Sequence, residues 1–235
     1  MQDERKLAFP ARHELKYYIN PAELSVIRAR LGPVMRLDAH CANGPYDIRS
    51  LYFDDIYDSA YWEKLAGVEH RDKYRIRIYN YSDAAVFLER KRKLGDFIQK
   101  SSVRITPRLA QRLIEGDSSG LMSAKSELLK EVFLLMRNRV LRPKVIVDYK
   151  REAYVHPVEN VRITFDTCLR SGLSSVDLFD PNVPTVCPHD KNLEILEVKY
   201  DNYLPDFVKG LLVGLSADRS AISKYVLCRR FEPLP

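Results

Sequence analysis

The chain has 235 residues, of which 46% are hydrophobic and 30% are charged, and its formal net charge is +6 at pH 7. This length suits one large domain or two small ones, and the hydrophobic content excludes a disordered chain. The excess of positive charge favours an anionic partner, such as nucleic acid, phosphates or a membrane surface.

Several classes of protein are excluded by particular residue types. The four cysteines form no CxxC pair and no histidine lies at zinc-ligand spacing, which argues against a structural zinc site. The N-terminal segment MQDERKLAFPARH is charged, and no run approaches the roughly 18 apolar residues of a membrane span. We therefore expect a cytoplasmic protein with free thiols, without a signal peptide or a membrane segment of its own.

The predicted elements follow one another along the chain with short connections. Alternation of apolar and polar residues marks strands, and apolar residues at helical spacing after a cap residue mark helices. In chain order we expect a strand at 12–19, a helix at 21–31, a strand at 46–54, a short helix ending at Gly67, strands at 72–81, 85–94 and 97–105, a helix between Pro107 and Gly116, a helix at 123–139, strands at 144–155, 160–167 and 192–200, and helices at 205–215 and 218–228. Short turns between neighbouring strands favour antiparallel pairing, so we expect a single α+β domain over residues 1–235.

Cations line one face of most of these strands. In KYRIRIYNY, residues 73–81, Lys73, Arg75 and Arg77 share one face while the other face is apolar, and the cations lie about 6–7 Å apart. The same alternation places charged residues on one face in the sets Arg12, Glu14 and Lys16; Glu89, Lys91 and Lys93; Lys100, Ser102 and Arg104; Glu197 and Lys199; and at Arg151 and Arg162. Taken alone, each strand more often belongs to an antiparallel sheet that has one face in water.

A closed barrel explains all eight strands together. The apolar faces match the amphipathic helices, which need a surface to cover, and eight strands enclose an interior wide enough for one ligand. Burying so many cations is costly unless an anion fills the interior. We therefore predict a closed eight-stranded antiparallel β-barrel, a tunnel with a basic lumen and helices packed outside, that binds a polyphosphate chain. The isolated glutamates would suit Mg²⁺ or Mn²⁺ bridging phosphate oxygens.

An ordered set of short segments gives the chain a family resemblance. The segments are RHELKYYI, RSLYFDD with WEKLAG, KYRIRIY, FLERK, KSSVRI, DYKREAY, VRITFDT, LEVKY and ISKY, and they span about residues 12 to 225. The sequence resembles a VTC (vacuolar transporter chaperone) domain, the polyphosphate polymerase branch of the triphosphate tunnel metalloenzymes. That superfamily is marked by ExExK in its first strand, whereas Arg12 replaces the first glutamate here. The same loss is typical of the polymerase branch.

The resemblance implies transfer of the γ-phosphate of ATP to a growing polyphosphate chain, with Mn²⁺ or Mg²⁺. The residues it implies as catalytic are Arg75, Arg77, Lys91, Arg151, Arg162 and Glu197. Those implied to bind substrate are Lys16, Arg71, Glu89, Lys100, Lys199 and Lys224, and those implied to hold the metal are Glu197 and Glu14. Relatives of this branch carry polyphosphate across a membrane as it is made, which would require a separate membrane partner here. The sequence leaves the oligomeric state open.

Three other functions are compatible with parts of the pattern. A tripolyphosphate or nucleotide hydrolase, or a cyclase-type lyase, would need more carboxylates at the metal site than the first strand supplies. A non-catalytic module that binds polyphosphate or inositol phosphates would use the same basic lumen, although the presence of Glu197 favours turnover. Nucleic acid is disfavoured as a partner, because aromatic residues do not interleave with the cations as in a stacking platform.

Overall fold

The computed structural model describes residues 13–95, 97–190, 192–214 and 219–231. The strands are β1 (His13–Ile19), β2 (Arg36–Leu37), β3 (Tyr46–Asp54), β4 (His70–Tyr79), β5 (Ser82–Leu94), β6 (Phe97–Ile105), β7 (Arg142–His156), β8 (Val161–Ser171) and β9 (Glu194–Tyr200). The α-helices are α1 (Pro21–Leu31), α2 (Ser59–Leu65), α3 (Pro107–Ile114), α4 (Glu127–Asn138), α5 (Asp206–Leu211) and α6 (Lys224–Arg229). Short 3₁₀ turns are η1 (Ala39–Cys41), η2 (Leu121–Ser123) and η3 (Val158–Asn160).

All eight predicted strands are present, and the differences lie at their ends. β8 continues to Ser171, into a segment predicted as loop, because the register against β7 shifts near Cys168, whose φ is 53°. Such a bulge interrupts the alternation by which a strand is recognised. The two-residue strand β2 was not predicted, since so short a strand has no periodicity. Helices α5 and α6 are shorter than predicted, and parts of their predicted ranges, at 215–218, lie outside the described residues.

The prediction of a closed barrel is not confirmed. The antiparallel strands pair in the order β1-β9-β8-β7-β3-β4-β5-β6, with β2 added to β7. Within the part of the chain that the structure describes, β1 and β6 are the two edges of the sheet and no backbone pairing joins them. Strand alternation predicts which side chains share a face, but the total twist and stagger of the sheet decide whether its edges meet.

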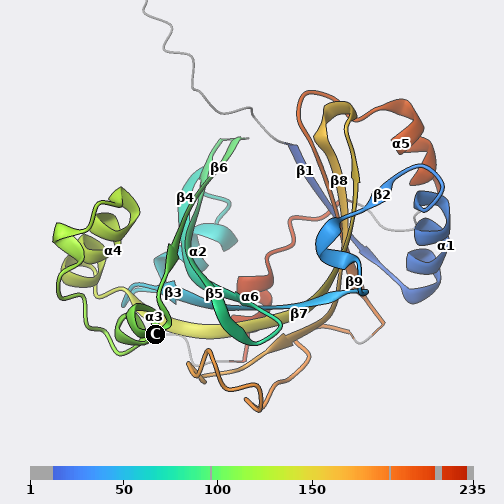
Figure 1. Ribbon diagram of the computed structural model, residues 1–235. Coiled ribbons are helices and arrows are strands. Elements are labelled where there is room, and N and C mark those ends of the chain that lie inside the picture. Colours follow the sequence, from blue (N-terminus) through green and yellow to red (C-terminus); the bar gives the residue numbers. More distant parts are fainter. Residues whose placement is uncertain (1–12, 96, 191, 215–218, 232–235) are drawn as a thin grey trace, which may run out of the picture.

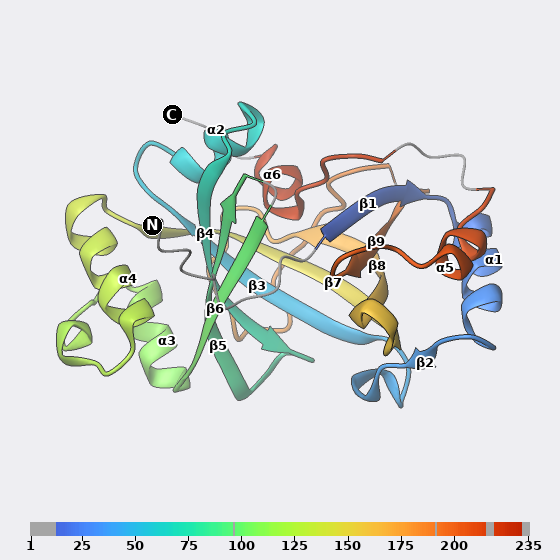
Figure 2. The ribbon, with the colours of Figure 1, turned by 90° about the horizontal axis from the view of Figure 1, so that it is seen from above.

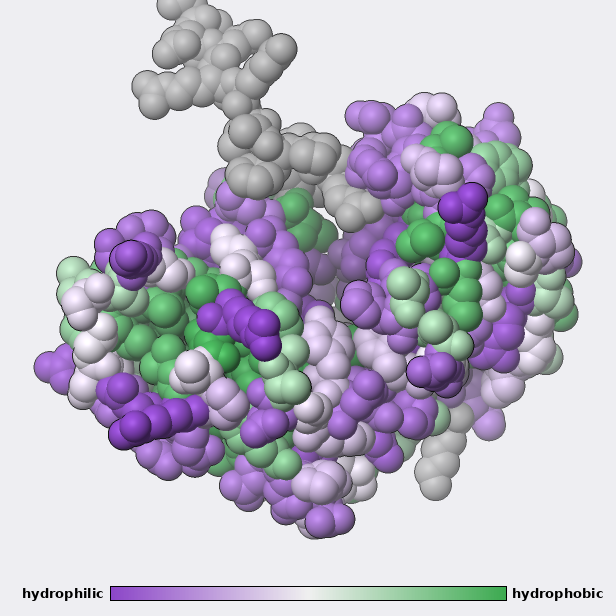
Figure 3. Space-filling model, viewed as in Figure 1, coloured by the Kyte–Doolittle hydropathy of each residue, from purple (hydrophilic) through white to green (hydrophobic). Residues whose placement is uncertain are grey.

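The open sheet is strongly curved and forms a trough, seen end-on in Figure 1 and from above in Figure 2. Strands β3 and β7 make its floor, β4, β5 and β6 make one wall, and β1, β9 and β8 make the other. We use "trough" for this concave face, which runs from Lys16 on β1 to Lys100 on β6. Figure 3 shows the hollow between the two walls with hydrophilic residues on both sides of it.

The convex face is covered by helices, as the amphipathic patterns predicted. Helix α1 buries Leu24, Ile27 and Leu31 in a cluster with the outward-facing residues of β8 and β9. Its start is fixed by Asn20, whose side chain accepts a hydrogen bond from the backbone N–H of Glu23 while the Glu23 carboxylate accepts one from Asn20. Helices α3 and α4 cover the other wall in the same way. No described helix is long and apolar enough to cross a membrane.

Helix α6 departs from the expectation that every helix packs outside. Its residues Tyr225 and Leu227 belong to one apolar cluster with Val147, Tyr149 and Tyr52, which face the trough. Val147 faces inward because it and Arg77 both pair with Ser50 of β3, and cross-strand partners share a face. Helix α6 therefore fills one end of the trough from inside, next to α2 (Figure 2).

Candidate functional site

The trough brings together most of the charged residues that the sequence predicted to share a face. Strand register places Lys16 opposite Glu197, Arg75 opposite Glu89, and Arg151 opposite Asp166. The charged side chains form three groups, each built around buried carboxylates. Their cations are Lys16, Arg75, Arg77, Lys91, Lys100, Arg151, Lys199 and Lys224, and their carboxylates are Glu14, Glu89, Asp166 and Glu197.

The first group surrounds Glu89 of β5. Its Oε2 lies 2.7 Å from Arg75 Nη2 and 3.6 Å from Arg77 Nη1, and Lys100 pairs with its other oxygen. Burial opposes ionisation of Glu89, but Arg75, Arg77 and Lys100 outweigh it and lower the pKa to about 2. Arg75 also donates a 2.7 Å hydrogen bond from Nη1 to the hydroxyl of Tyr52. Two guanidinium groups are thus held in fixed positions on one wall of the trough.

The second group joins the two walls through Glu14 and Glu197. Lys16 Nζ lies 2.8 Å from Glu14 Oε1 and 3.4 Å from Glu197 Oε2, so one ammonium bridges both carboxylates. Lys91 of β5 reaches across the open side of the trough to Glu14 Oε2, at 2.9 Å, and Lys199 pairs with Glu197. Burial raises the pKa of Glu14, but Lys16 and Lys91 lower it to about 2. The pKa of Glu197 likewise lies well below its usual value, because Lys199 and Lys16 outweigh its burial.

The third group is built on Asp166, which the sequence reasoning missed. This fully buried carboxylate accepts two hydrogen bonds from Arg151, 2.6 Å from Nε and 2.7 Å from Nη2, and pairs with Lys224 of α6. Burial raises the pKa of Asp166, but Arg151 and Lys224 lower it to about 2. The sequence does indicate this residue, because strand alternation in VRITFDT, residues 161–167, places Asp166 on the same face as Arg162.

Lys73 stands apart from the three groups. It belongs to KYRIRIYNY but was not among the predicted site residues, and it pairs with no carboxylate of the described residues. Its Nζ donates a 2.8 Å hydrogen bond to Ser223 Oγ at the start of α6 and lies 5.5 Å from the ring centre of Tyr225. Burial, and after it the repulsion from Lys16 and Lys91, lowers the pKa of Lys73 well below its usual value.

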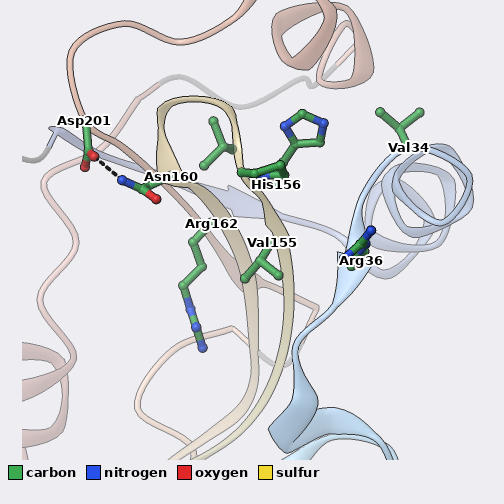
Figure 4. A pocket seen from close by; sticks show the side chains of 9 residues that line it. Val34, Arg36, Val155, His156, Asn160, Arg162 and Asp201 are labelled. Atoms are coloured by element: carbon green, nitrogen blue, oxygen red, sulfur yellow. Dashed lines mark hydrogen bonds between the residues drawn. The ribbon is translucent and has the colours of Figure 1, made fainter.

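Two predicted residues lie at the margins of the site. Arg162 pairs with Asp38, 2.5 Å from Nη1 to Oδ2, and lines an open pocket of about 750 Å³ at the β7–β8 turn (Figure 4). The guanidinium of Arg71 donates to the backbone carbonyl of Val68, outside the three groups. Arg12, which takes the place of the first glutamate of the superfamily pattern, lies outside the described residues.

A metal ion would have two neighbouring carboxylates to bind, Glu14 and Glu197. No three or more His, Cys, Asp or Glu residues of the described ranges are arranged to hold a metal by themselves. Mg²⁺ does not require such a cage, because it usually keeps waters and substrate phosphates beside one or two carboxylates. Oε1 of Glu197 is buried beside the ammonium of Lys199, and the surrounding cations keep both carboxylates in the ionised form that binds a metal. The donor set therefore fits Mg²⁺ or Mn²⁺ bound together with a phosphate ligand.

Comparison with known proteins gives a family match and distant structural neighbours. The family model of the VTC domain matches residues 11–231. No curated protein matches the chain. Among solved structures, the PH1819 protein of Pyrococcus horikoshii OT3 is 16% identical with a TM-score of 0.46, over 92% of this chain and 97% of that one. A Bacillus halodurans protein described as a candidate adenylate cyclase is 12% identical with a TM-score of 0.43, over 86% of this chain and 87% of that one. The family match covers nearly the whole chain, and the protein belongs to the VTC domain family.

Proposed function

We propose that this protein is a phosphotransferase of the polyphosphate polymerase type, which transfers the γ-phosphate of ATP to a polyphosphate chain bound in the trough. The observation that carries the proposal is the charge balance of the trough. Its cations outnumber its carboxylates, and Lys73 is half-buried without a carboxylate partner among the described residues. A cluster of this kind is stabilised by a ligand with several negative charges along its length, which is the chemistry of a polyphosphate.

The fixed guanidinium groups suit phosphoryl transfer. This reaction needs the attacking and leaving oxygens in line and the charge on the transferred group stabilised, with little covalent work by the protein. Arg75 is held by Glu89 and Tyr52, and Arg151 is held by Asp166 through two hydrogen bonds. Donors oriented before the substrate arrives need no reorganisation during the reaction.

The trough would also align donor and acceptor. Cations on both walls can hold a triphosphate and the end of a chain one behind the other, which replaces a bimolecular encounter by a bound geometry. The terminal phosphate of the chain is an anion at neutral pH, so the reaction requires no side chain to remove a proton from the nucleophile. Lys224 and Lys100 face the trough from α6 and β6 and would bind the outer phosphates.

Glu197 and Glu14 would hold the Mn²⁺ or Mg²⁺ ion. When bound, such an ion would neutralise charge on the phosphate oxygens. Lys16 lies between the two carboxylates, so its ammonium would be available to a phosphate bound beside them. Lys199, paired with Glu197 on the same strand, would keep that carboxylate ionised and oriented.

The proposal is tested by incubating the purified protein with ATP and Mn²⁺, with and without a short polyphosphate primer. Products are resolved by gel and ADP is assayed in parallel. We expect long chains together with stoichiometric ADP, a loss of both in Glu197→Gln, and wild-type behaviour in the matched control Glu127→Gln, whose side chain is 85% exposed. Free phosphate without chains would instead identify a hydrolase. Stabilisation by polyphosphate without any turnover would identify a binding module.

A further inference from the structure

A row of aromatic rings lies at the end of the trough opposite α6. It consists of His40 in η1, Tyr46 at the start of β3, Tyr79 at the end of β4 and Phe87 in β5. Figure 2 shows this end, with β2 and the β4–β5 hairpin, on the other side of the molecule from α2 and α6. These residues come from four separate elements, and the proposed phosphoryl transfer makes no use of them.

The rings contact one another without parallel stacking, and each of them is at least partly exposed. Ring centres are 6.2 Å apart between His40 and Tyr46, 6.0 Å between Tyr46 and Tyr79, and 6.2 Å between Tyr79 and Phe87. The interplanar angles are 62°, 51° and 75°, so none of the three contacts is a parallel stack. His40 is exposed and the other three are only partly buried. The row is therefore accessible, unlike a closed core cluster.

The row is continuous with the cations of the trough. Phe87 is paired with Arg77 across β4 and β5, and Tyr46 is paired with Arg151 across β3 and β7, so these rings share the inner face. Burial raises the pKa of the Tyr46 hydroxyl, and Arg151, followed by Arg162, opposes this shift. A ligand with a flat ring at one end and phosphates at the other would contact the rings and the guanidinium groups together.

We infer that this row binds the nucleobase of the nucleoside triphosphate donor, with its phosphates directed toward Arg77 and Arg151. The inference rests on the proposed function, because it assigns the base end of the same substrate. Stacking on aromatic rings tolerates any base, since every base has a π-face. The row therefore predicts that GTP binds about as well as ATP. A triphosphate ligand without a base should bind more weakly than either.

The test compares two ligands that differ only in the base. Affinities for ATP and for ribose 5-triphosphate, which has the same phosphate ester and no base, are measured by calorimetry in the presence of Mg²⁺. For the wild-type protein we expect ATP to bind about tenfold more tightly. Tyr79→Leu should remove this advantage and keep the affinity for ribose 5-triphosphate. The conservative variant Tyr79→Phe should restore the advantage, and Tyr57→Leu, at a tyrosine that is 68% exposed, should retain it.

Three results would overturn the inference. Equal affinities of the wild-type protein for the two ligands would show that the base makes no contact. An ATP advantage that persists in both Tyr79→Leu and Tyr46→Leu would place the base elsewhere. A substitution that lowers the affinities for ATP and for ribose 5-triphosphate equally would show that the rings only support the structure of the trough. Failure of this inference is distinguishable from failure of the proposed function, because chain synthesis is assayed independently and the contribution of the base to affinity is measured without turnover.

A spectroscopic measurement distinguishes stacking from an indirect effect of the substitution. The fluorescence of 2-aminopurine riboside triphosphate is quenched when its base stacks on an aromatic ring. We expect quenching on binding to the wild-type protein and to Tyr79→Phe, and unquenched binding to Tyr79→Leu. Quenching that is the same in all three proteins would contradict the placement of the base on this row.

Discussion

Lys91 of β5 and Glu14 of β1 meet across the open side of the trough, with 2.9 Å between Nζ and Oε2. No backbone hydrogen bond of the described residues joins the strands at the two edges of the sheet, so side chains link the walls where the barrel is not closed. Burial lowers the pKa of Lys91 to about 8, because the attraction of Glu14 only partly offsets it and Lys16 and Lys199 repel the charge. This residue therefore changes charge near physiological pH.

Binding of tripolyphosphate should weaken as the pH rises above 8. Once Lys91 is neutral in the free protein, each further pH unit costs up to about tenfold in affinity, since one proton must be taken up on binding. The measurement is calorimetry from pH 7 to 9.5, compared with Lys91→Arg, which stays charged throughout. The loss of affinity above pH 8 should be absent in Lys91→Arg. An equal dependence of affinity on pH in the two proteins would contradict the assignment of this effect to Lys91.

The free energy of unfolding should rise with pH as Lys91 loses its proton, whereas the affinity for tripolyphosphate should fall. The folded pKa of Lys91, about 8, lies below the unfolded value of roughly 10.4, so the unfolded chain binds more protons between these limits. The contribution of Lys91 to the free energy of unfolding is therefore least favourable below pH 8 and rises through this window. Thermal unfolding of the wild-type protein and of Lys91→Met from pH 7.5 to 10 would check this. A constant difference in melting temperature between them would count against it.

Replacing Asp166 by asparagine should destabilise the protein and make it dependent on anions. Arg151 and Lys224 would keep their buried charges without the carboxylate between them, which costs about 3–5 kcal/mol for a broken buried pair. Tripolyphosphate should then raise the melting temperature of Asp166→Asn more than that of the wild-type protein. The matched control is Asp206→Asn, whose side chain is 95% exposed and which should melt like the wild-type protein. An unchanged melting temperature for Asp166→Asn would refute the prediction.

Glu89→Gln should separate binding from turnover. The carboxylate of Glu89 neutralises part of the charge of Arg75, Arg77 and Lys100, so its removal should tighten the binding of tripolyphosphate severalfold. Turnover should fall by about tenfold or more, because the guanidinium groups lose the partner that orients them. Affinity by calorimetry and kcat in the polymerisation assay measure the two effects. Weaker binding together with slower turnover would show that Glu89 only maintains the local structure.

Tyr225→Phe should loosen α6 at its end of the trough. The Tyr225 hydroxyl donates a 2.5 Å hydrogen bond to Oδ2 of buried Asp54, and burial already raises the pKa of that carboxyl. Removing the donor should cost about 1–3 kcal/mol of unfolding free energy. It should also lower the affinity for tripolyphosphate, because Lys224 on the same helix faces the trough. Tyr203→Phe, at a tyrosine that is 58% exposed, is the control. A stability loss without any change in affinity would show that α6 does not shape the site.

The sequence by itself determined the strands and the identity of the inner face. Successive side chains of a strand point to opposite faces, so the spacing of Arg75 and Arg77 settles that they share one. The same local rule puts Lys73 on this face, as predicted, and it also covers Asp166, which lies two residues from Thr164 and four from Arg162 on one strand. Helix α1 was predictable for a similar reason, since its capping residues and apolar spacing are contained in one short segment.

Only the tertiary structure decided how the faces meet. Closure depends on twist and stagger added over the whole sheet, and no local pattern shows that β1 and β6 stay apart. The pairing of Arg162 with Asp38, the position of α6 inside the trough and the aromatic row around Tyr79 all join residues distant in the chain. These contacts follow from strand register and packing, which many weak interactions fix together, whereas alternation along a strand is fixed by the geometry of neighbouring residues.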